Sequence, residues 1–208
     1  LRKTFKNYGI CHAISFHRSV DAAHKFQLSQ DKFSASYPEY GSLKTFHVSG
    51  QMPSSVRNQN LCEFESTEKS LITNAKCLTE GIDIPNVDCI LFADPKNSVI
   101  DIVQATGRAL RLAKGKKLGY IIVPVIVDDI NSPDLSTEDF NNILTVLRAL
   151  GSNDERIIEY FSYLAHHRGE RPYGPIDWDI PVEEVINPDE FISSLELSCW
   201  ERVQGLAW

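Results

Sequence analysis

The 208-residue sequence lacks several features that would place it in other classes of protein. No apolar run approaches the roughly 20 residues that a helix needs to cross a bilayer, and we find no secretory signal. The five cysteines are odd in number and never form C-x-x-C, which favours reduced thiols over disulfides or a zinc site. The six histidines show no H-E-x-x-H spacing, and we expect the pair His166-His167 to be exposed. These absences predict a cytoplasmic protein of one or two domains without a metal site.

Lysine is absent from the last part of the chain, where negative charge accumulates. Residues 1–125 carry 16 Lys+Arg and 11 Asp+Glu, a balance of +5, whereas residues 126–208 carry 5 and 17, a balance of -12. A nucleic-acid track would therefore belong to the first part, and the acidic part would repel nucleic acid or meet a protein. An acidic segment that only keeps the protein soluble is the alternative.

The clearest local signal is a helix predicted from Ser98 to Arg111. Ser98 followed three residues later by Asp101 is an N-cap signature. Positions i, i+3, i+4 and i+7 share one face of this helix, and they are Gln104, Gly107, Arg108 and Arg111. No acidic residue lies three or four positions from either arginine, so local ion pairs do not explain them. Paired arginines beside a glycine suit a polyanion such as a nucleoside triphosphate, and a solvated helix face is the alternative.

The residues upstream form a strand, a polar loop and a second strand. Residues 71–73 are the end of a short buried strand, and the loop 74–85 carries Gly81 and Asp83 where it could meet a sugar or a phosphate. Residues 87–93 then form an apolar strand.

These residues carry a specific resemblance. The string T-N-x(5)-E-G-I-D-I-P from Thr73, a strand ending in D-P, and Q-A-T-G-R-A-L-R from Gln104 resemble motifs V and VI of superfamily 2 helicases and translocases. Those motifs belong to the second of two RecA-like motor domains. The string ISFHRSVDAAHKF resembles motif IV, although we assign no function to His17 or Arg18 from it. The stretch from Asp94 through the basic turn and the strand GYIIVPV also resembles the motor of restriction-associated DNA translocases.

The predicted fold is α/β, a doubly wound, mostly parallel RecA-like sheet with a C-terminal helical extension. Strands are expected at residues 11–16, 45–48, 71–73, 87–93 and 120–127, and the last of these should be buried on both faces. Helices are expected at residues 18–30, 53–64, 98–111, 136–150 and 154–168, with residues 31–43 a connecting loop that has room for a distorted helical turn. The helix 53–64 should turn Val56, Leu61 and Phe64 inward and Arg57 outward. We expect three parts: a motor domain at 1–127, a helical extension at 128–168, and an acidic, proline-containing linker with a terminal helix at 169–208.

The resemblance implies roles for individual residues at an ATP site. Arg111, and secondarily Arg108, would act as arginine fingers, and Gln104 would contact the phosphates or the attacking water. Gly81 and Gly107 would allow close approach, and Asp83 would bond the ribose.

The resemblance also implies a nucleic-acid track made of small hydrogen-bond donors and one arginine. The backbone-contact candidates are Ser49, Gly50, Arg57, Thr73 and Asn74. A turn glycine and a solvated arginine are the alternative.

The sequence contains no G-x-x-x-x-G-K-[ST] loop and no D-E-x-H run, so the other half of an ATP site is missing. Because it also begins at Leu1 without methionine, we expect a segment of a longer polypeptide. The resemblance implies ATP and Mg²⁺ as cofactors, with Mg²⁺ held by the absent first motor domain, and a fragment that does not hydrolyse ATP alone. Partners would be nucleic acid, duplex DNA first, the first RecA-like domain, and a nuclease or methyltransferase domain. The alternatives are a non-catalytic interaction module that works through its acidic segment, and an RNA helicase or remodeller.

Overall fold

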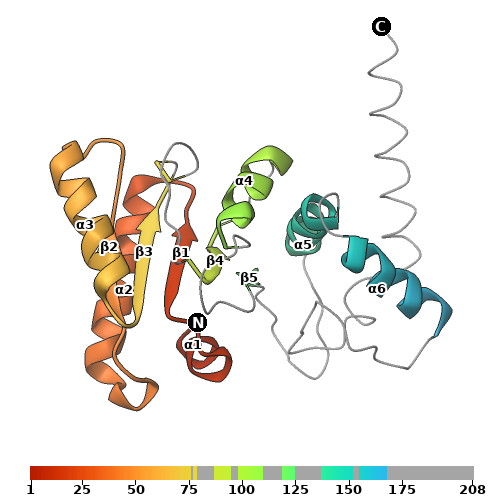
Figure 1. Cartoon of the computed structure of the whole chain (residues 1–208), viewed down its shortest axis with the longest axis horizontal. Coiled ribbons are helices and arrows are strands. Elements are labelled where there is room, and N and C mark those ends of the chain that lie inside the picture. The colour runs from red at the N-terminus through yellow and green to blue at the C-terminus, as the bar shows by residue number, and fades with distance from the viewer. Residues whose placement is uncertain are drawn as a thin grey trace, which may run out of the picture. The chain divides into compact units, whose positions relative to one another are not determined.

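The computed structural model describes residues 1–75, 77–78, 87–94, 98–109, 119–124, 137–151 and 155–167 (Figure 1). The chain divides into two compact units, Leu1–Pro95 with Val103–Pro124 and Lys96–Ile102 with Val125–Trp208. Its elements are α1 (Arg2–Tyr8), β1 (His12–Phe16), α2 (Val20–Ser36), η1 (Pro38–Tyr40), β2 (Lys44–His47), α3 (Ser54–Ser66), β3 (Ser70–Asn74), β4 (Cys89–Phe92), α4 (Val99–Ala109), β5 (Tyr120–Ile122), α5 (Thr137–Gly151) and α6 (Glu155–His166).

The strands of the first unit form one five-stranded sheet in the order β2-β3-β1-β4-β5. Every pair of neighbouring strands is parallel, and Ile14 of β1 is in register with Ile72 of β3 and Ile90 of β4. All residues of β3 and β4 are buried, as expected for inner strands of a parallel sheet covered on both faces. The predicted α/β class and mostly parallel, doubly wound sheet are confirmed.

The helices α2 and α3 cover opposite faces of this sheet. The chain passes β3 on its way from β1 to β2 and then returns to β3, so right-handed crossovers place the two connecting helices on opposite sides. Contacts of two adjacent β2 residues support this arrangement. The ring centroid of His47 lies 5.4 Å from that of His24 in α2, whereas the ring of Phe46, the preceding residue, lies edge-on to Phe64 of α3 with centroids 6.3 Å apart. Successive strand residues thus point into two separate cores.

The helix α2 is longer than the sequence predicted, because residues 31–36 continue it, whereas the 3-10 turn at residues 38–40 agrees with the helical turn allowed for in the loop 31–43. A tertiary contact explains the extension. The guanidinium of Arg2 donates to the main-chain oxygens of Gln30, at 2.8 Å, and Gly41, at 3.1 Å, and lies over the ring of Phe33. A partner this distant in sequence is invisible to local patterns.

The inward face of α3 is also different from the predicted one. Leu61 and Phe64 are buried as expected, but Val56 is 44% exposed and Arg57, expected outside, is half-buried. The stripe that faces the sheet runs through positions 57, 60, 61 and 64, and its first half is polar: Asn60 donates to the main-chain oxygen of His47 at 3.1 Å. A hydrophobic pattern cannot find such a stripe.

The strand β5 is short and half-exposed, so the prediction of a strand 120–127 buried on both faces is wrong for its described part. Among the strands that the structure describes it pairs with β4 alone, and its three residues are partly accessible. Residues 125–127 lie outside the described residues.

The second unit contains α5 and α6, close to the predicted helices 136–150 and 154–168. Apolar side chains of both helices are buried, and the helices contact each other. The buried residues include Ile143, Leu147, Ile157 and Tyr160. The expected linker and terminal helix at 169–208 lie outside the described residues, so the three-part division of the chain stays a prediction.

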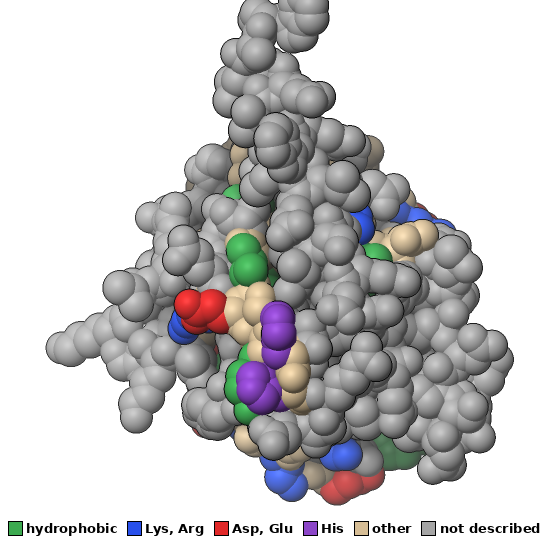
Figure 2. Space-filling view, turned by 90° about the vertical axis from the view of Figure 1, so that its right-hand side faces the viewer, with side chains coloured by type: hydrophobic (Ala, Val, Ile, Leu, Met, Phe, Trp, Pro, Cys, Tyr) green, Lys and Arg blue, Asp and Glu red, His purple; other side chains and the backbone are tan. Residues whose placement is uncertain are grey.

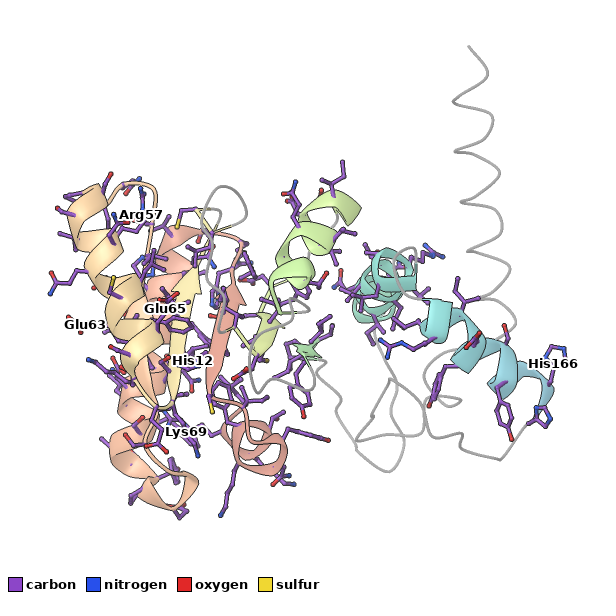
Figure 3. All side chains as sticks on the ribbon, viewed as in Figure 1. His12, Arg57, Glu63, Glu65, Lys69 and His166 are labelled. Atoms are coloured by element: carbon purple, nitrogen blue, oxygen red, sulfur yellow. The ribbon has the colours of Figure 1, made fainter. Side chains whose placement is uncertain are left out.

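Histidine side chains stand next to one another on the face drawn in Figure 2. At the end of α6, His166 (labelled in Figure 3) and His167 are both exposed, as predicted. Their Nδ1 atoms lie 2.7 Å from Ser162 O and 3.2 Å from Tyr163 O, so local main-chain contacts account for both rings.

The described residues bear on the predictions about cysteines and about membrane-spanning helices. Cys11, Cys62, Cys77 and Cys89, the cysteines in the described part of the chain, are free thiols. Of the helices that the structure describes, none is both long and apolar enough to span a membrane.

Candidate nucleotide and nucleic-acid interface

The carboxyl ends of β1, β2, β3 and β4 meet at one edge of the sheet, where ligands bind in open α/β folds. Main-chain hydrogen bonds continue the ladder one residue beyond these strands. The N–H of His17 donates to Asn74 O at 2.9 Å, that of Val48 to Thr73 O at 3.0 Å, and that of Ala93 to Phe16 O at 3.1 Å. The connecting segments therefore leave the sheet from a common, ordered edge.

The turn after β2 brings an exposed glycine to this edge. The N–H of Met52 donates to Ser49 O at 3.2 Å, which closes a tight turn around Gly50. The Ser49 side chain is buried, whereas Gly50 is exposed and a side chain added there would meet open space. Of the two predicted contacts, Gly50 thus presents its main chain outward and Ser49 supports the turn.

Arg57 lies at the same edge, in the first turns of α3 (Figure 3). Its Nε is buried and has no hydrogen-bond partner in the structure. The guanidinium lies near Cys77, in the segment after β3: burial raises the pKa of that thiol, and the Arg57 charge opposes the rise. An unpaired buried N–H costs about 1–3 kcal/mol. Arg57 as a whole is only half-buried, so its side chain keeps some accessible surface at this edge.

Thr73 and Asn74 have no accessible side-chain surface and are occupied by internal partners. Thr73 Oγ1 lies 3.0 Å from His47 Nδ1, and the Asn74 amide donates to Ser15 O at 3.2 Å and accepts from the Leu78 N–H at 3.4 Å. In this geometry the two side chains hold the end of β3 and the start of the following loop instead of pointing at a ligand.

The helix α4 begins as predicted. Ser98 Oγ accepts from the Asp101 N–H at 3.2 Å, and Ser98 O accepts from the Ile102 N–H at 3.1 Å. Gln104 and Gly107 are exposed on one side, and a side chain added at Gly107 would meet open space. The other side, with Ile102, Ala105 and Thr106, is buried.

Four predicted ATP-site positions are not described in full. The main chain of Arg108 belongs to α4, but its side chain lies outside the described residues, as do Arg111, Gly81 and Asp83 entirely. The structure therefore brings together Gly50, Arg57 and the buried support of Thr73 and Asn74, and places Gln104 and Gly107 on one helix face.

His17 and Asp94 lie at this edge and were not among the predicted site residues. The Arg18 main-chain N–H donates to Asp94 Oδ2 at 3.0 Å, and the buried ring of His17 places Nδ1 3.6 Å from the same oxygen. Their positions in the sequence were the available signal, because His17 directly follows β1 and Asp94 lies two residues after β4, and both are inner strands of a parallel sheet.

The described residues contain no group of three or more histidine, cysteine or acidic side chains that could hold a metal ion.

Comparison with known proteins identifies the family of this chain. The model of the helicase conserved C-terminal domain matches residues 6–113, more than half of the chain. The chain is 28% identical over 128 residues to a helicase of African swine fever virus, covering 61% of this chain and 14% of that protein. It is also 28% identical over 144 residues to the ATP-dependent helicase IRC3 of Saccharomyces cerevisiae, covering 56% of this chain and 21% of that protein.

Solved structures agree in fold. The Type ISP restriction-modification enzyme LlaBIII bound to DNA aligns with a TM-score of 0.67 and 30% identity, over 78% of this chain and 11% of that one. Mycobacterium smegmatis helicase Lhr bound to ssDNA and AMP-PNP aligns with a TM-score of 0.51 and 14% identity, over 93% of this chain and 22% of that one, and shows the fold alone. The chain thus spans about a fifth or less of the two curated relatives. It belongs to the helicase conserved C-terminal domain family, as the second RecA-like domain of a superfamily 2 helicase.

Proposed function

We propose that this chain is the second motor domain of an ATP-dependent nucleic-acid translocase, with Arg111 and Arg108 as its arginine fingers. The observation that carries the proposal is the polarity of α4. Gln104 and Gly107 are exposed while Ile102, Ala105 and Thr106 are buried. Arg108 follows Gln104 by four residues on this helix, a spacing that supports placing it on the exposed side, and Arg111 lies outside the described residues.

On this proposal the exposed side of α4 faces ATP and combines a glycine, which leaves space, with a side chain that can form hydrogen bonds. Gly107 leaves open space for close approach, and Gln104 would contact the phosphates or the attacking water. Gly81 and Asp83 would complete this half of the site at the sugar. ATP supplies the free energy of the cycle, and arginine fingers contribute about 10³–10⁵ in rate where they have been measured.

Mg²⁺ and the phosphate loop would come from the first motor domain of the parent polypeptide, because this sequence contains neither motif. The 208-residue chain alone should therefore not hydrolyse ATP. Closure of the two domains on ATP and reopening after hydrolysis would step the pair along a strand. Within the chain we assign the motor to residues 1–127, the helical extension to 128–168 and the linker with its terminal helix to 169–208.

The nucleic-acid track would run over the carboxyl edge at Gly50 and Arg57. Arg57 as a whole is only half-buried and its guanidinium has the chemistry to bond a phosphate oxygen, and the open main chain at Gly50 lets a backbone approach. Ser49, Thr73 and Asn74 would act from behind, by holding the turn and the strand end that carry these groups.

We infer duplex DNA as the nucleic acid and a restriction-type parent with nuclease or methyltransferase domains. Support comes from LlaBIII, which is named as bound to DNA and is 30% identical over 78% of this chain. We also infer that the parent protein acts inside the cell, in the cytoplasm.

The experiment is ATP turnover by the full parent polypeptide with no nucleic acid, duplex DNA, single-stranded DNA or RNA. Wild type, Arg111→Ala, Arg111→Lys and Lys3→Ala are compared. We expect duplex DNA to stimulate the wild type and the Lys3→Ala control equally, since Lys3 is exposed on α1 at the opposite edge. Arg111→Ala should lose about 10³-fold or more in kcat, and Arg111→Lys most of that, because lysine keeps the charge without the bidentate fork.

Normal turnover by Arg111→Ala would refute the arginine-finger assignment. Absence of stimulation by any nucleic acid would favour a non-catalytic interaction module, and stimulation by RNA alone would favour an RNA helicase.

A further inference from the structure

A connected polar network joins the ends of the three central strands β3, β1 and β4. The Asp94 carboxylate, after β4, accepts from the Arg18 main-chain N–H and lies 3.6 Å from His17 Nδ1. His17 in turn donates its main-chain N–H to Asn74 O at 2.9 Å, after which Asn74 reaches Ser15 and Leu78 through its own side chain. The Asp94 carboxylate is thus linked, through this series of polar contacts, to the segment that follows β3.

The His17 ring is held on both sides. Its Nε2 lies 3.0 Å from Ser15 Oγ, and its ring centroid lies 4.9 Å from that of Phe26 in α2, with the two rings tilted by 48°. The Nδ1 side of the ring faces Asp94 and the Nε2 side faces the Ser15 hydroxyl, which itself donates to the main-chain oxygen of Ile72 at 3.5 Å.

Serine, histidine and aspartate in this order also form the catalytic triads of hydrolases. Here Ser15 is completely buried inside β1 and His17 is only 4% exposed. No substrate can reach the serine hydroxyl, so this arrangement is a support and not a nucleophile.

The strong bond in the network is the one to the main chain. A carboxylate that accepts a main-chain N–H at 3.0 Å makes a charge-assisted hydrogen bond. The ion pair to the Arg18 side chain is 3.9 Å long and that side chain is 79% exposed, so solvent screens it. Removing the carboxylate would therefore release the turn between β1 and α2, and the His17 ring with it.

We propose that Asp94 is a positioning residue for the ATPase cycle of the parent protein: it holds the β1–α2 turn, and through His17 the end of β3 and the loop from Asn74 to Leu78. This inference rests on the proposed function, because its consequence is expressed in nucleic-acid-stimulated ATP turnover. It assigns a purpose to the buried histidine that motif resemblance leaves without one.

The sheet contains a matched control at its opposite edge. Asp88, just before β4, also uses one oxygen, Oδ2, to accept main-chain N–H groups, from Cys11 at 2.9 Å and from His12 at 3.0 Å. Both carboxylates are half-buried and both bind β4 to β1. Only Asp94 lies at the edge where the loops of the site leave.

The test compares the full parent polypeptide as wild type, Asp94→Ala, Asp94→Asn and Asp88→Ala. The readouts are kcat and KM for ATP with saturating linear duplex DNA, and hydrogen exchange of peptides that cover residues 15–20, 74–78 and 10–12. We expect Asp94→Ala to lower kcat about 10- to 100-fold with KM for ATP within about threefold, because misplaced groups slow chemistry more than they weaken binding. Asp94→Asn keeps an acceptor for the Arg18 N–H and should lose only about two- to fivefold.

Asp88→Ala should leave kcat within about twofold of wild type, which fits a purely structural role. Exchange should rise at residues 15–20 and 74–78 in Asp94→Ala, and at residues 10–12 in Asp88→Ala. If Asp94→Ala does not fold, an Asp94→Asn variant with wild-type kcat overturns the proposal.

The possible failures can be told apart. A wild-type parent without nucleic-acid-stimulated turnover overturns the proposed function and the positioning role with it. A stimulated wild type whose Asp94→Ala variant matches Asp88→Ala in kcat overturns the positioning role alone.

Discussion

Mild acid should destabilise the sheet through two buried histidines. His17 is 4% exposed and His47 is 8% exposed, and each ring makes a hydrogen bond or close polar contact inside the protein. Burial lowers the pKa of both rings below the ordinary 6.5. For His17 the Asp94 carboxylate opposes the shift, and for His47 the neighbouring His24 adds to it.

The direction follows from linkage. A base with a lowered pKa in the folded state takes up protons more readily when unfolded, so stability is complete above about pH 6.5 and falls as the pH drops towards the folded pKa. Each histidine contributes at most about 1.4 kcal/mol per pH unit in that window, and two contribute at most about 2.7. Between pH 6.5 and 5.5 stability should fall, by at most about 2 kcal/mol for the two histidines together, because the unfolded histidines are already half protonated at pH 6.5.

Hydrogen exchange by mass spectrometry on the 208-residue chain suits this test, because it reports on β3 directly. Opening free energies for the peptide that covers residues 70–74, corrected for the intrinsic pH dependence of exchange, are compared at pH 7.5, 6.5 and 5.5.

The variant carrying His17→Gln and His47→Gln should lose most of the pH dependence, because glutamine keeps hydrogen-bonding capacity and cannot titrate. The exposed His166→Gln serves as the control and should behave as wild type. An equal loss of stability on acidification in the double variant and in wild type would refute the argument.

Two further predictions test the track and the core. Arg57→Ala in the parent polypeptide should weaken duplex DNA binding about 10-fold and reduce the slope of log K against log salt by about 1, with Arg57→Lys intermediate, as measured by fluorescence anisotropy across a salt series; an unchanged slope would remove Arg57 from the track. Phe64→Ala should lower the free energy of unfolding by about 3–5 kcal/mol in urea titrations, because Phe64 is completely buried against His12 and Phe46, and a loss below about 1 kcal/mol would contradict that packing.

The central strands could be predicted from the sequence because their signal is local. β1, β3 and β4 are short apolar runs whose both faces are buried, and periodicity and turn residues suffice to place them. The start of α4 was predictable for the same reason, since the cap at Ser98 involves residues only three positions apart. The pattern could not tell that β5 is an edge strand, because sheet order depends on crossovers and not on composition.

The site divides in the same way. Sequence resemblance could name Thr73, Asn74 and Arg57 as candidates for one track, but it could not distinguish a buried support from a free contact. That distinction depends on partners far away in the chain: Asn74 donates to Ser15 across 59 positions, and Arg18 donates to Asp94 across 76. The same gap hid Asp94, whose partners are main-chain groups that leave no pattern in the sequence.

The distribution of buried polar side chains indicates that the carboxyl edge of the sheet holds its loops in fixed orientations. Most of the buried polar residues in the described part of the chain follow or end the strands at the carboxyl edge, namely Ser15, His17, His47, Ser49, Thr73 and Asn74. Well-packed apolar residues at such positions would often be at least as stable, since buried polar groups gain little net free energy even when they are paired. Apolar contacts, however, are not directional, whereas a hydrogen bond fixes both the position and the angle of the group that makes it. A sheet that only had to stay folded would not need this at one edge; a sheet whose loops must meet a phosphate and a nucleic-acid backbone at fixed angles would need it there.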